Sequence, residues 1–277
     1  MSIIKINDHM VTNDDLIITN KLAKNKECAA PYGRLFQILG VENGRRVVRE
    51  IACNTVVVGG AILALENITG ATATWKPSTL NDIYGVPAIP SGASKLSLFG
   101  IGTGGANLDF GSVIAPNIKQ RDIMNPIPMR YGSIITGEDN GRYFMKVPNS
   151  GGSTNSWYLK EFTGTPVIKS CWKNAISSDD DGTEILSDIH NSENTEGIET
   201  FTEIQIDLNT FDGREYFEST GTMVGARYNT IGFYTGSRNA EGTEYGDVRL
   251  YSVVSFNNRD LSIASKSHFV YRIYSLI

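Results

Sequence analysis

The sequence predicts a mainly β protein, an antiparallel β-sandwich or an open barrel, with a mixed N-terminal region (residues 1–94) that contains one helix. Three observations support this prediction. Clusters of Gly, Asn, Ser and Thr separate short apolar segments, and 28 of the 277 residues are glycine, which is typical of turn-rich β structure. Apolar and polar residues alternate with a period of two in much of residues 95–277. The last nine residues, 269–277, carry bulky side chains on both faces of a strand.

Apolar and polar residues show no regular spacing in the first 50 or so residues. Leu16–Ile18 can form a short strand, and Arg34–Leu39 can form either a helical turn or another strand. Asn43-Gly44 is a turn signal, and Arg45–Ile51 is expected to leave that turn as a strand. Prolines and a glycine interrupt Thr79–Pro90, which we expect to be a loop.

The predicted helix spans about residues 54–69. Asn54 or Thr55 can cap its start, and Gly70 follows where a C-terminal glycine belongs. The pair Gly59-Gly60 weakens the prediction, because each glycine costs about 1 kcal/mol in a helix interior, but it also permits close backbone packing. We interpret the segment as a core helix; a membrane or partner-binding role is the alternative. The apolar residues at helical spacing are Val57, Val58, Ala61, Ile62, Leu65 and Ile68.

Residues 95–277 form the predicted β domain. Arg142–Lys146 and Ser156–Lys160 flank a polar loop and are expected to form a hairpin with its tip near Gly151. Residues 177–200 are acidic and poor in apolar side chains, so we expect an exposed loop there. The other expected extended segments are Leu96–Ile101, Asn125–Tyr131, Pro166–Trp172, Arg227–Tyr234, Asp247–Phe256 and Ser267–Ile277.

Residues 203–208 show the period-two pattern most clearly. The Ile and Leu residues of this segment point to one side, and its Glu, Gln and Asp residues point to the other. Asp212-Gly213 then marks a turn. Short strands joined in this way suggest an antiparallel sandwich or an open barrel.

Composition and charge exclude several classes of function. The net charge is -5 with no long basic run, so we expect no nucleic-acid partner. The longest apolar run, Val56–Leu65, is too short to span a bilayer, which takes about 20 residues, so we expect no membrane partner. The N-terminus lacks the pattern of a signal peptide. The three scattered cysteines, Cys28, Cys53 and Cys171, indicate reduced thiols made in a cytoplasm.

Sequence motifs for cofactors or metals are weak. Gly100–Gly105 matches the dinucleotide pattern G-x-G-x-x-G, but no helical period follows it, so a glycine-rich strand exit is the favoured interpretation. Residues 177–188 loosely follow the spacing of a calcium loop, but the final bidentate Glu is replaced by Asp188, and a solvated acidic loop is favoured. The three histidines lie far apart in the sequence. We therefore predict no cofactor and no metal.

The sequence also contains candidate residues for a glycoside hydrolase site and for a sugar-binding face. Glycoside hydrolysis uses paired carboxylates, and Asp207 with Asp212, or Glu215 with Glu218, lie close together in the sequence; we interpret them as charges beside turns. Aromatic residues on strands can line a sugar-binding face, although they are more often core or interface residues. The tryptophans considered for such a face are Trp75, Trp157 and Trp172.

Loose patterns in residues 95–277 point to one family of proteins. They are Leu98–Gly105, Asn125–Tyr131, Tyr158–Phe162 leading to Thr165–Ile168, Ala226–Tyr234 and Phe269–Tyr274. Together these segments resemble structural proteins of tailed bacteriophage virions, and the resemblance is closest to neck or baseplate components of contractile-tailed phages. It implies a protein without enzymatic activity that is repeated in a ring or around an axis.

The predicted function is therefore that of a structural component of a phage particle, made in the host cytoplasm and located in the virion. Its partners would be other virion proteins and copies of itself, joined by edge strands and extended arms, with no small-molecule substrate. The alternatives are a carbohydrate-binding or receptor-binding fibre or tail module, and a cell-wall hydrolase. The C-terminal strand contacts either a neighbour or its own sheet. The interface candidates are Phe269, Tyr271, Tyr274, Ile277 and the hairpin tip at Gly151.

Overall fold

The computed structural model describes residues 32–42, 45–87, 93–107, 112–132, 134–136, 141–172, 198–222, 226–261 and 267–275. Within these residues, one antiparallel sheet of 12 strands and three helices make up the fold, which confirms the predicted mainly β class. The strands are β1 (Tyr32–Glu42), β2 (Arg45–Val56), β3 (Lys95–Gly102), β4 (Pro126–Ile127), β5 (Arg130–Tyr131), β6 (Tyr143–Pro148), β7 (Asn155–Glu161), β8 (Thr163–Trp172), β9 (Ile198–Leu208), β10 (Arg227–Arg238), β11 (Tyr245–Asp260) and β12 (Ser267–Ser275). The helices are α2 (Val58–Thr69), α3 (Leu80–Tyr84) and α4 (Arg214–Ser219).

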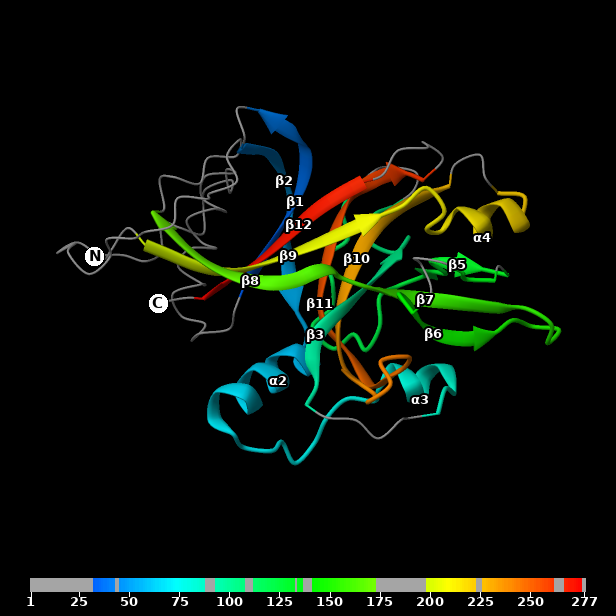
Figure 1. Cartoon of the computed structure of the whole chain (residues 1–277), viewed down its shortest axis with the longest axis horizontal. Coiled ribbons are helices and arrows are strands. Elements are labelled where there is room, and N and C mark those ends of the chain that lie inside the picture. Colours follow the sequence, from blue (N-terminus) through cyan, green and yellow to red (C-terminus); the bar gives the residue numbers. More distant parts are fainter. Residues whose placement is uncertain are drawn as a thin grey trace, which may run out of the picture.

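The strand order is β5-β7-β3-β10-β11-β2-β1-β12-β9-β8, with β4 beside β3 and β6 beside β7. The long strand β2 carries the sheet around a bend, because it pairs with β1 over most of its length and with β11 only at residues 54–56. Strands β1, β12, β9 and β8 thus form a first half of the sheet, and the strands from β11 to β5 form a second half (Figure 1). The sheet does not close into a barrel and is consistent with a sandwich or an open barrel.

The main core lies between the two halves. Tyr271 of β12 and Phe233 of β10 stack with their ring centroids 3.8 Å apart, which joins the halves face to face. A second core covers the other side of the second half, where Val57 and Leu80 pack with Leu98 of β3. Neighbouring residues of β3 therefore enter different cores, since side chains along a strand alternate between its faces.

Helix α2 begins later than predicted. Residues 54–56 belong to β2, because their backbone pairs with β11, and Val57 precedes the first helical residue. The predicted end is confirmed: Gly70 closes α2 in the left-handed conformation, with φ of 69°. Gly59 and Gly60 are buried in α2 where it packs against β11, and an added Cβ at Gly60 would overlap the backbone oxygen of Tyr251. The two glycines permit close packing, as the sequence suggested.

Two helices lie where none was predicted. Helix α3 falls inside the predicted loop Thr79–Pro90, where the side chains of Thr79 and Asp82 form a capping box with each other's backbone N–H. Residues 1–94 thus contain two helices in their described part instead of one. Helix α4 follows Gly213 within the predicted β domain. Both helices are short, and their local capping and turn contacts are a weaker signal than a hydrophobic period.

The hydrogen-bonded sheet crosses the predicted domain boundary at residues 94 and 95. Segment Arg34–Leu39 is part of strand β1, which pairs with β12, and the predicted strand Arg45–Ile51 is part of β2. The predicted strand Leu16–Ile18 lies outside the described residues. The N-terminal strands therefore share one sheet with the C-terminal strand.

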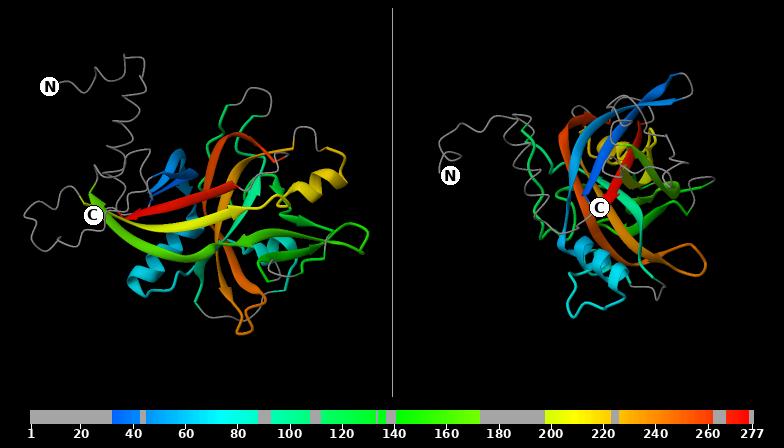
Figure 2. Two further views of the ribbon diagram at one scale, coloured as in Figure 1. Left: turned by 45° about the horizontal axis from the view of Figure 1, so that its top comes forward. Right: turned by 90° about the vertical axis from the view of Figure 1, so that its left-hand side faces the viewer.

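Most strands predicted after residue 95 are confirmed, and several are longer than expected. The hairpin of β6 and β7 has the predicted tip (Figure 2). Strand β9 starts at Ile198, so the predicted acidic loop 177–200 ends three residues too late, and the remainder of that loop lies outside the described residues.

Candidate functional site

The predicted interface strand at the C-terminus lies inside the sheet. Strand β12 pairs with β1 on one side and with β9 on the other. The side chains of Phe269, Tyr271 and Tyr274 are buried, so they contribute to the core of the monomer and are not available to a neighbouring protein. The C-terminal strand was expected to contact either a neighbour or its own sheet, and the structure shows that it pairs within its own sheet. Ile277 lies outside the described residues, and Gly151 is exposed at the hairpin tip with φ of 105°.

Tyr271 links strands β12, β2 and β11 where the sheet bends. Its hydroxyl accepts a hydrogen bond of 2.5 Å from the side-chain amide of Asn54 on β2 and lies 2.9 Å from the hydroxyl of Ser252 on β11. Burial raises the pKa of Tyr271. The residue thus contacts both sides of the bend, which explains why an aromatic side chain with a polar end occupies a central strand.

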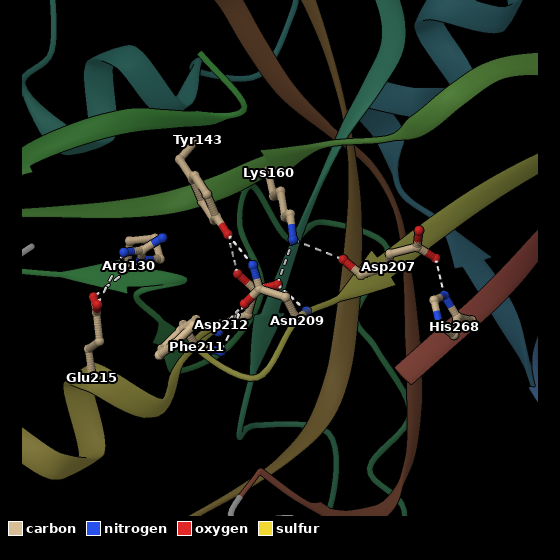
Figure 3. Close-up of polar contacts among 9 residues, drawn as sticks. All are labelled: Arg130, Tyr143, Lys160, Asp207, Asn209, Phe211, Asp212, Glu215 and His268. Carbon is tan, nitrogen blue, oxygen red and sulfur yellow. Dashed lines mark hydrogen bonds and ion pairs between the residues drawn. The ribbon is translucent and has the colours of Figure 1, made fainter. Parts of the chain in front are cut away.

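A buried ion pair joins β7 to the turn after β9 (Figure 3). Lys160 Nζ lies 2.7 Å from Asp212 Oδ2, and the two side chains are 2% and 0% exposed. The Tyr143 hydroxyl donates a hydrogen bond of 2.6 Å to Asp212 Oδ1. Asn209 donates its backbone N–H to Asp212 Oδ2 and its side-chain amide to the Tyr143 hydroxyl, at 2.8 and 3.0 Å. We call Tyr143, Lys160, Asn209 and Asp212 the buried polar cluster.

Local structure positions each member of this cluster. Tyr143 and Lys160 are directly opposite each other on the paired strands β6 and β7. The side-chain oxygen of Asn209 accepts the backbone N–H of Asp212, at 3.0 Å, which makes the turn that the sequence predicted at Asp212-Gly213. Gly213 has φ of 76° and donates its N–H to the carbonyl of Met129, so the turn is held against the second half of the sheet.

The electrostatics of the buried polar cluster are compatible with either a structural or a chemical role. Burial raises the pKa of Asp212 above its ordinary value of 3.8, although Lys160 and Tyr143 favour the ionised form. Such shifts are frequent in active sites, but structural ion pairs produce them too. Because Lys160 and Asp212 have almost no contact with solvent, we interpret the cluster as a structural link between the hairpin and the main core.

The carboxylates that could serve hydrolysis each bond a neighbouring side chain. Lys160 contacts both the backbone carbonyl of Asp207 and the carboxylate of Asp212, but the carboxylate of Asp207 bonds His268 instead (Figure 3). The structure therefore does not present Asp207 and Asp212 as the pair of open carboxyl groups that glycoside hydrolases use. The contacts are a hydrogen bond between Asp207 and His268 at 2.7 Å and three ion pairs, Asp212–Lys160 at 2.7 Å, Glu215–Arg130 at 3.2 Å and Glu218–Arg214 at 2.6 Å.

A second charged cluster lies in the first half of the sheet around Glu203 of β9. Its carboxylate bonds Arg46 of β2 at 2.6 Å, Lys169 of β8 at 3.0 Å and Arg272 of β12 at 3.2 Å. Burial alone raises the pKa of Glu203, but the hydrogen bonds from Arg46 and Lys169 outweigh burial and lower it below 4.5. This glutamate connects three strands to its own, so it stiffens the first half of the sheet.

Strand β8 ends the sheet on this side (Figure 2). In the described part of the chain it pairs with β9 alone, so its other edge has no strand beside it. Residues 164–168 are exposed, and the apolar side chains of Val167 and Ile168 are 51% and 74% exposed. The sequence of residues 166–172 predicts a strand but does not reveal that it lies at an edge, because strand order depends on pairings between separate segments.

A groove of about 660 Å³ lies beside the β6–β7 hairpin. Trp157 of β7 lines it, and Lys146 of β6 lies opposite Trp157 in the register, with its ammonium 5.9 Å from the centre of a Trp157 ring. The loop between β10 and β11 contributes Glu244. Of the other tryptophans considered for sugar binding, Trp75 is exposed after α2, and the side chain of Trp172 lies outside the described part.

The glycine motif on β3 serves packing. Gly104 and Gly105 donate their N–H groups to the carbonyl of Met124 and the side chain of Asn229, and an added Cβ at Gly102 would lie 2.9 Å from the carbonyl of Met124. The described residues that follow the motif form no helix, so no helix N-terminus faces these glycines there. This confirms the interpretation as a glycine-rich strand exit.

The described residues hold no group of three or more His, Cys, Asp or Glu side chains arranged to bind a metal, and the calcium-like segment 177–188 lies outside them. None of the helices in the described ranges has the length and apolar character to cross a membrane.

No family model matches this chain, and no curated protein or solved structure matches it significantly.

Proposed function

We propose that this protein is a non-catalytic structural component of a tailed-bacteriophage particle, in the neck or baseplate region, and that it joins neighbouring proteins through the outer edge of strand β8. The resemblance of five segments in residues 95–277 to virion structural proteins supports the biological setting. The mainly β fold supports assembly through strand edges. The observation that carries the proposed contact is that, within the described ranges, the outer edge of β8 has no strand beside it and Val167 and Ile168 are exposed.

The chemistry of that edge suits strand addition. An edge strand presents unpaired N–H and C=O groups, so a strand of a neighbour can extend the sheet by backbone hydrogen bonds. Val167 and Ile168 add apolar surface next to those groups. The partner strand comes from another virion protein or from a second copy of this chain.

Side-chain contacts with β9 also hold strand β8 in place. Lys169 bonds Glu203 on the neighbouring strand β9, and the hydroxyls of Ser170 and Thr200 lie 2.9 Å apart across the same pair of strands. A strand fixed by its own sheet loses little conformational freedom when a partner binds, so more of the interaction energy remains for binding.

The biological setting is tested by density-gradient sedimentation of the native protein from its source, followed by immunodetection. We expect the protein to migrate with complete particles. Migration only as a free species of the size of this chain would contradict the virion role.

The contact is tested by the double variant V167K/I168K, which places charges on the exposed edge. We expect this variant to stay folded, because both side chains are exposed, and to be lost from particles in a complementation experiment. The control is I68K, which changes an exposed residue of α2, outside β8. Normal incorporation of V167K/I168K would refute the β8 contact while leaving the virion role open to the sedimentation result.

A further inference from the structure

The groove beside the β6–β7 hairpin has properties that the assembly role does not explain. Its volume of about 660 Å³ falls within the range of small-molecule sites, roughly 300–1,000 Å³. It is bordered by the hairpin, by the segment that includes Gly132, Ile134 and Ile135, and by the end of β10 with the loop after it, where Arg238 donates a hydrogen bond of 2.9 Å to the carbonyl of Gly242. Three separate parts of the chain therefore form its walls.

Aromatic side chains held by the core line part of the groove. Tyr143 and Phe144 are buried, and Tyr143 is fixed from behind by its hydrogen bond to Asp212 (Figure 3). Trp157 is half-buried: part of its ring packs against the main core, and it also lines the groove. Core packing alone accounts for the buried part of Trp157 but not for the part that faces the groove.

The polar groups around Trp157 are available to a ligand. Among the described residues, the ammonium of Lys146, the carboxylate of Glu244 and the side-chain amide of Asn155 have no hydrogen-bond or ion-pair partner. Arg238 in the same groove differs, because Glu161 binds its guanidinium at 3.0 Å. The groove thus combines an aromatic ring with an unpaired cation, anion and amide.

We propose that this groove binds a short saccharide, with one sugar ring stacked on Trp157. Sugars have an apolar face of C–H groups that packs on an aromatic ring and a rim of hydroxyls that both donate and accept hydrogen bonds. Lys146 can donate to such hydroxyls, Glu244 can accept from them, and Asn155 can do both. The ligand class follows from this mixture, because a purely apolar ligand would leave all three groups without partners.

The test uses the purified full chain on an array of bacterial surface oligosaccharides that includes neutral and uronate-bearing chains. An oligosaccharide that binds is then titrated while the intrinsic tryptophan fluorescence is recorded. We expect W157A to weaken its binding by at least about tenfold and K146A to weaken it several-fold. The matched control is W75A, because Trp75 is 61% exposed and lies outside the groove.

Circular dichroism of each variant separates loss of binding from loss of folding. If W157A is unfolded, then W157F, which keeps an aromatic ring, and K146A, which changes an exposed side chain, decide the question. Absence of binding to every oligosaccharide on the array overturns the proposal. Equal affinity of W157A or K146A and the unaltered protein overturns it as well. Neither result depends on whether the protein migrates with particles.

Discussion

Lys160 and Asp212 form an ion pair with almost no contact with solvent. The surrounding groups satisfy both charges: Asp212 accepts hydrogen bonds from Tyr143 and Asn209, and Lys160 also donates one to the carbonyl of Asp207, at 3.0 Å. Removing the charge of only one member would leave the other buried and uncompensated, which costs more than the pair itself contributes. The stability of the protein therefore depends on keeping both charges or neither.

We predict that K160M lowers the free energy of unfolding by about 3–5 kcal/mol, because Asp212 would lose its buried counter-ion and would have to stay charged without compensation or take up a proton when the chain folds. The double variant K160M/D212N is expected to lose less than the sum of the two single variants, since neither charge remains. Urea denaturation of the three variants measures these values. The control is R214M, which breaks the exposed pair Arg214–Glu218 and should cost about 0–1 kcal/mol. A small effect of K160M would contradict the structural role of the pair.

At the scale of elements, helix α2 shows a conflict between local preference and packing. Glycine disfavours a helix, yet Gly59 and Gly60 occupy its first turn because α2 lies directly on the backbone of β11. An alanine at Gly59 would bring its Cβ to 3.0 Å from the carbonyl of Leu250, and the fit at Gly60 is closer still. Tertiary packing therefore overrides helix propensity here.

We predict that G60A destabilises the protein by about 1–3 kcal/mol, even though alanine favours the helix by about 1 kcal/mol. The overlap with the backbone of Tyr251 cannot be relieved by turning a side chain, which is why the packing cost dominates. Thermal denaturation compares this variant with G40A, at an exposed position with open space around it. Stabilisation by G60A would mean that α2 does not approach β11 as closely as described.

At the scale of the whole molecule, the two ends of the chain depend on each other. Strand β12 lies between β1 and β9, so the first half of the sheet cannot form without the C-terminal residues. The strands β1 and β12 are about 230 residues apart in the chain, judged from the pairing of Phe36 with Val270. Contacts between such distant segments tie the fold into one cooperative unit.

We predict that deletion of residues 269–277 prevents folding, because it removes the buried side chains of β12 and separates β9 from β1. Circular dichroism and size-exclusion chromatography of the purified chain measure the outcome. A variant of the outer strand, V167K/I168K, is the matched comparison and should remain folded. A truncated protein that stays soluble and folded would show that β12 is dispensable.

The sequence by itself determined the local features of this protein. The period-two pattern placed Ile204, Ile206 and Leu208 on one side of their strand, and in the structure all three are buried in the main core. Gly70, the hairpin tip and the turn at Asp212-Gly213 were also predicted correctly. Each of these features depends on residues within a few positions of one another, so its signal is present in a short stretch of sequence.

Only the tertiary structure decided which groups meet. Glu203 lies on the polar side of its strand and is nevertheless buried, because Arg46, Lys169 and Arg272 reach it from three other strands. In the same way, strand order placed the aromatic C-terminus inside the sheet and left β8 at its edge. Alternation within one strand cannot encode these outcomes, because they depend on pairings between separate strands, which for β1 and β12 are about 230 residues apart in the chain.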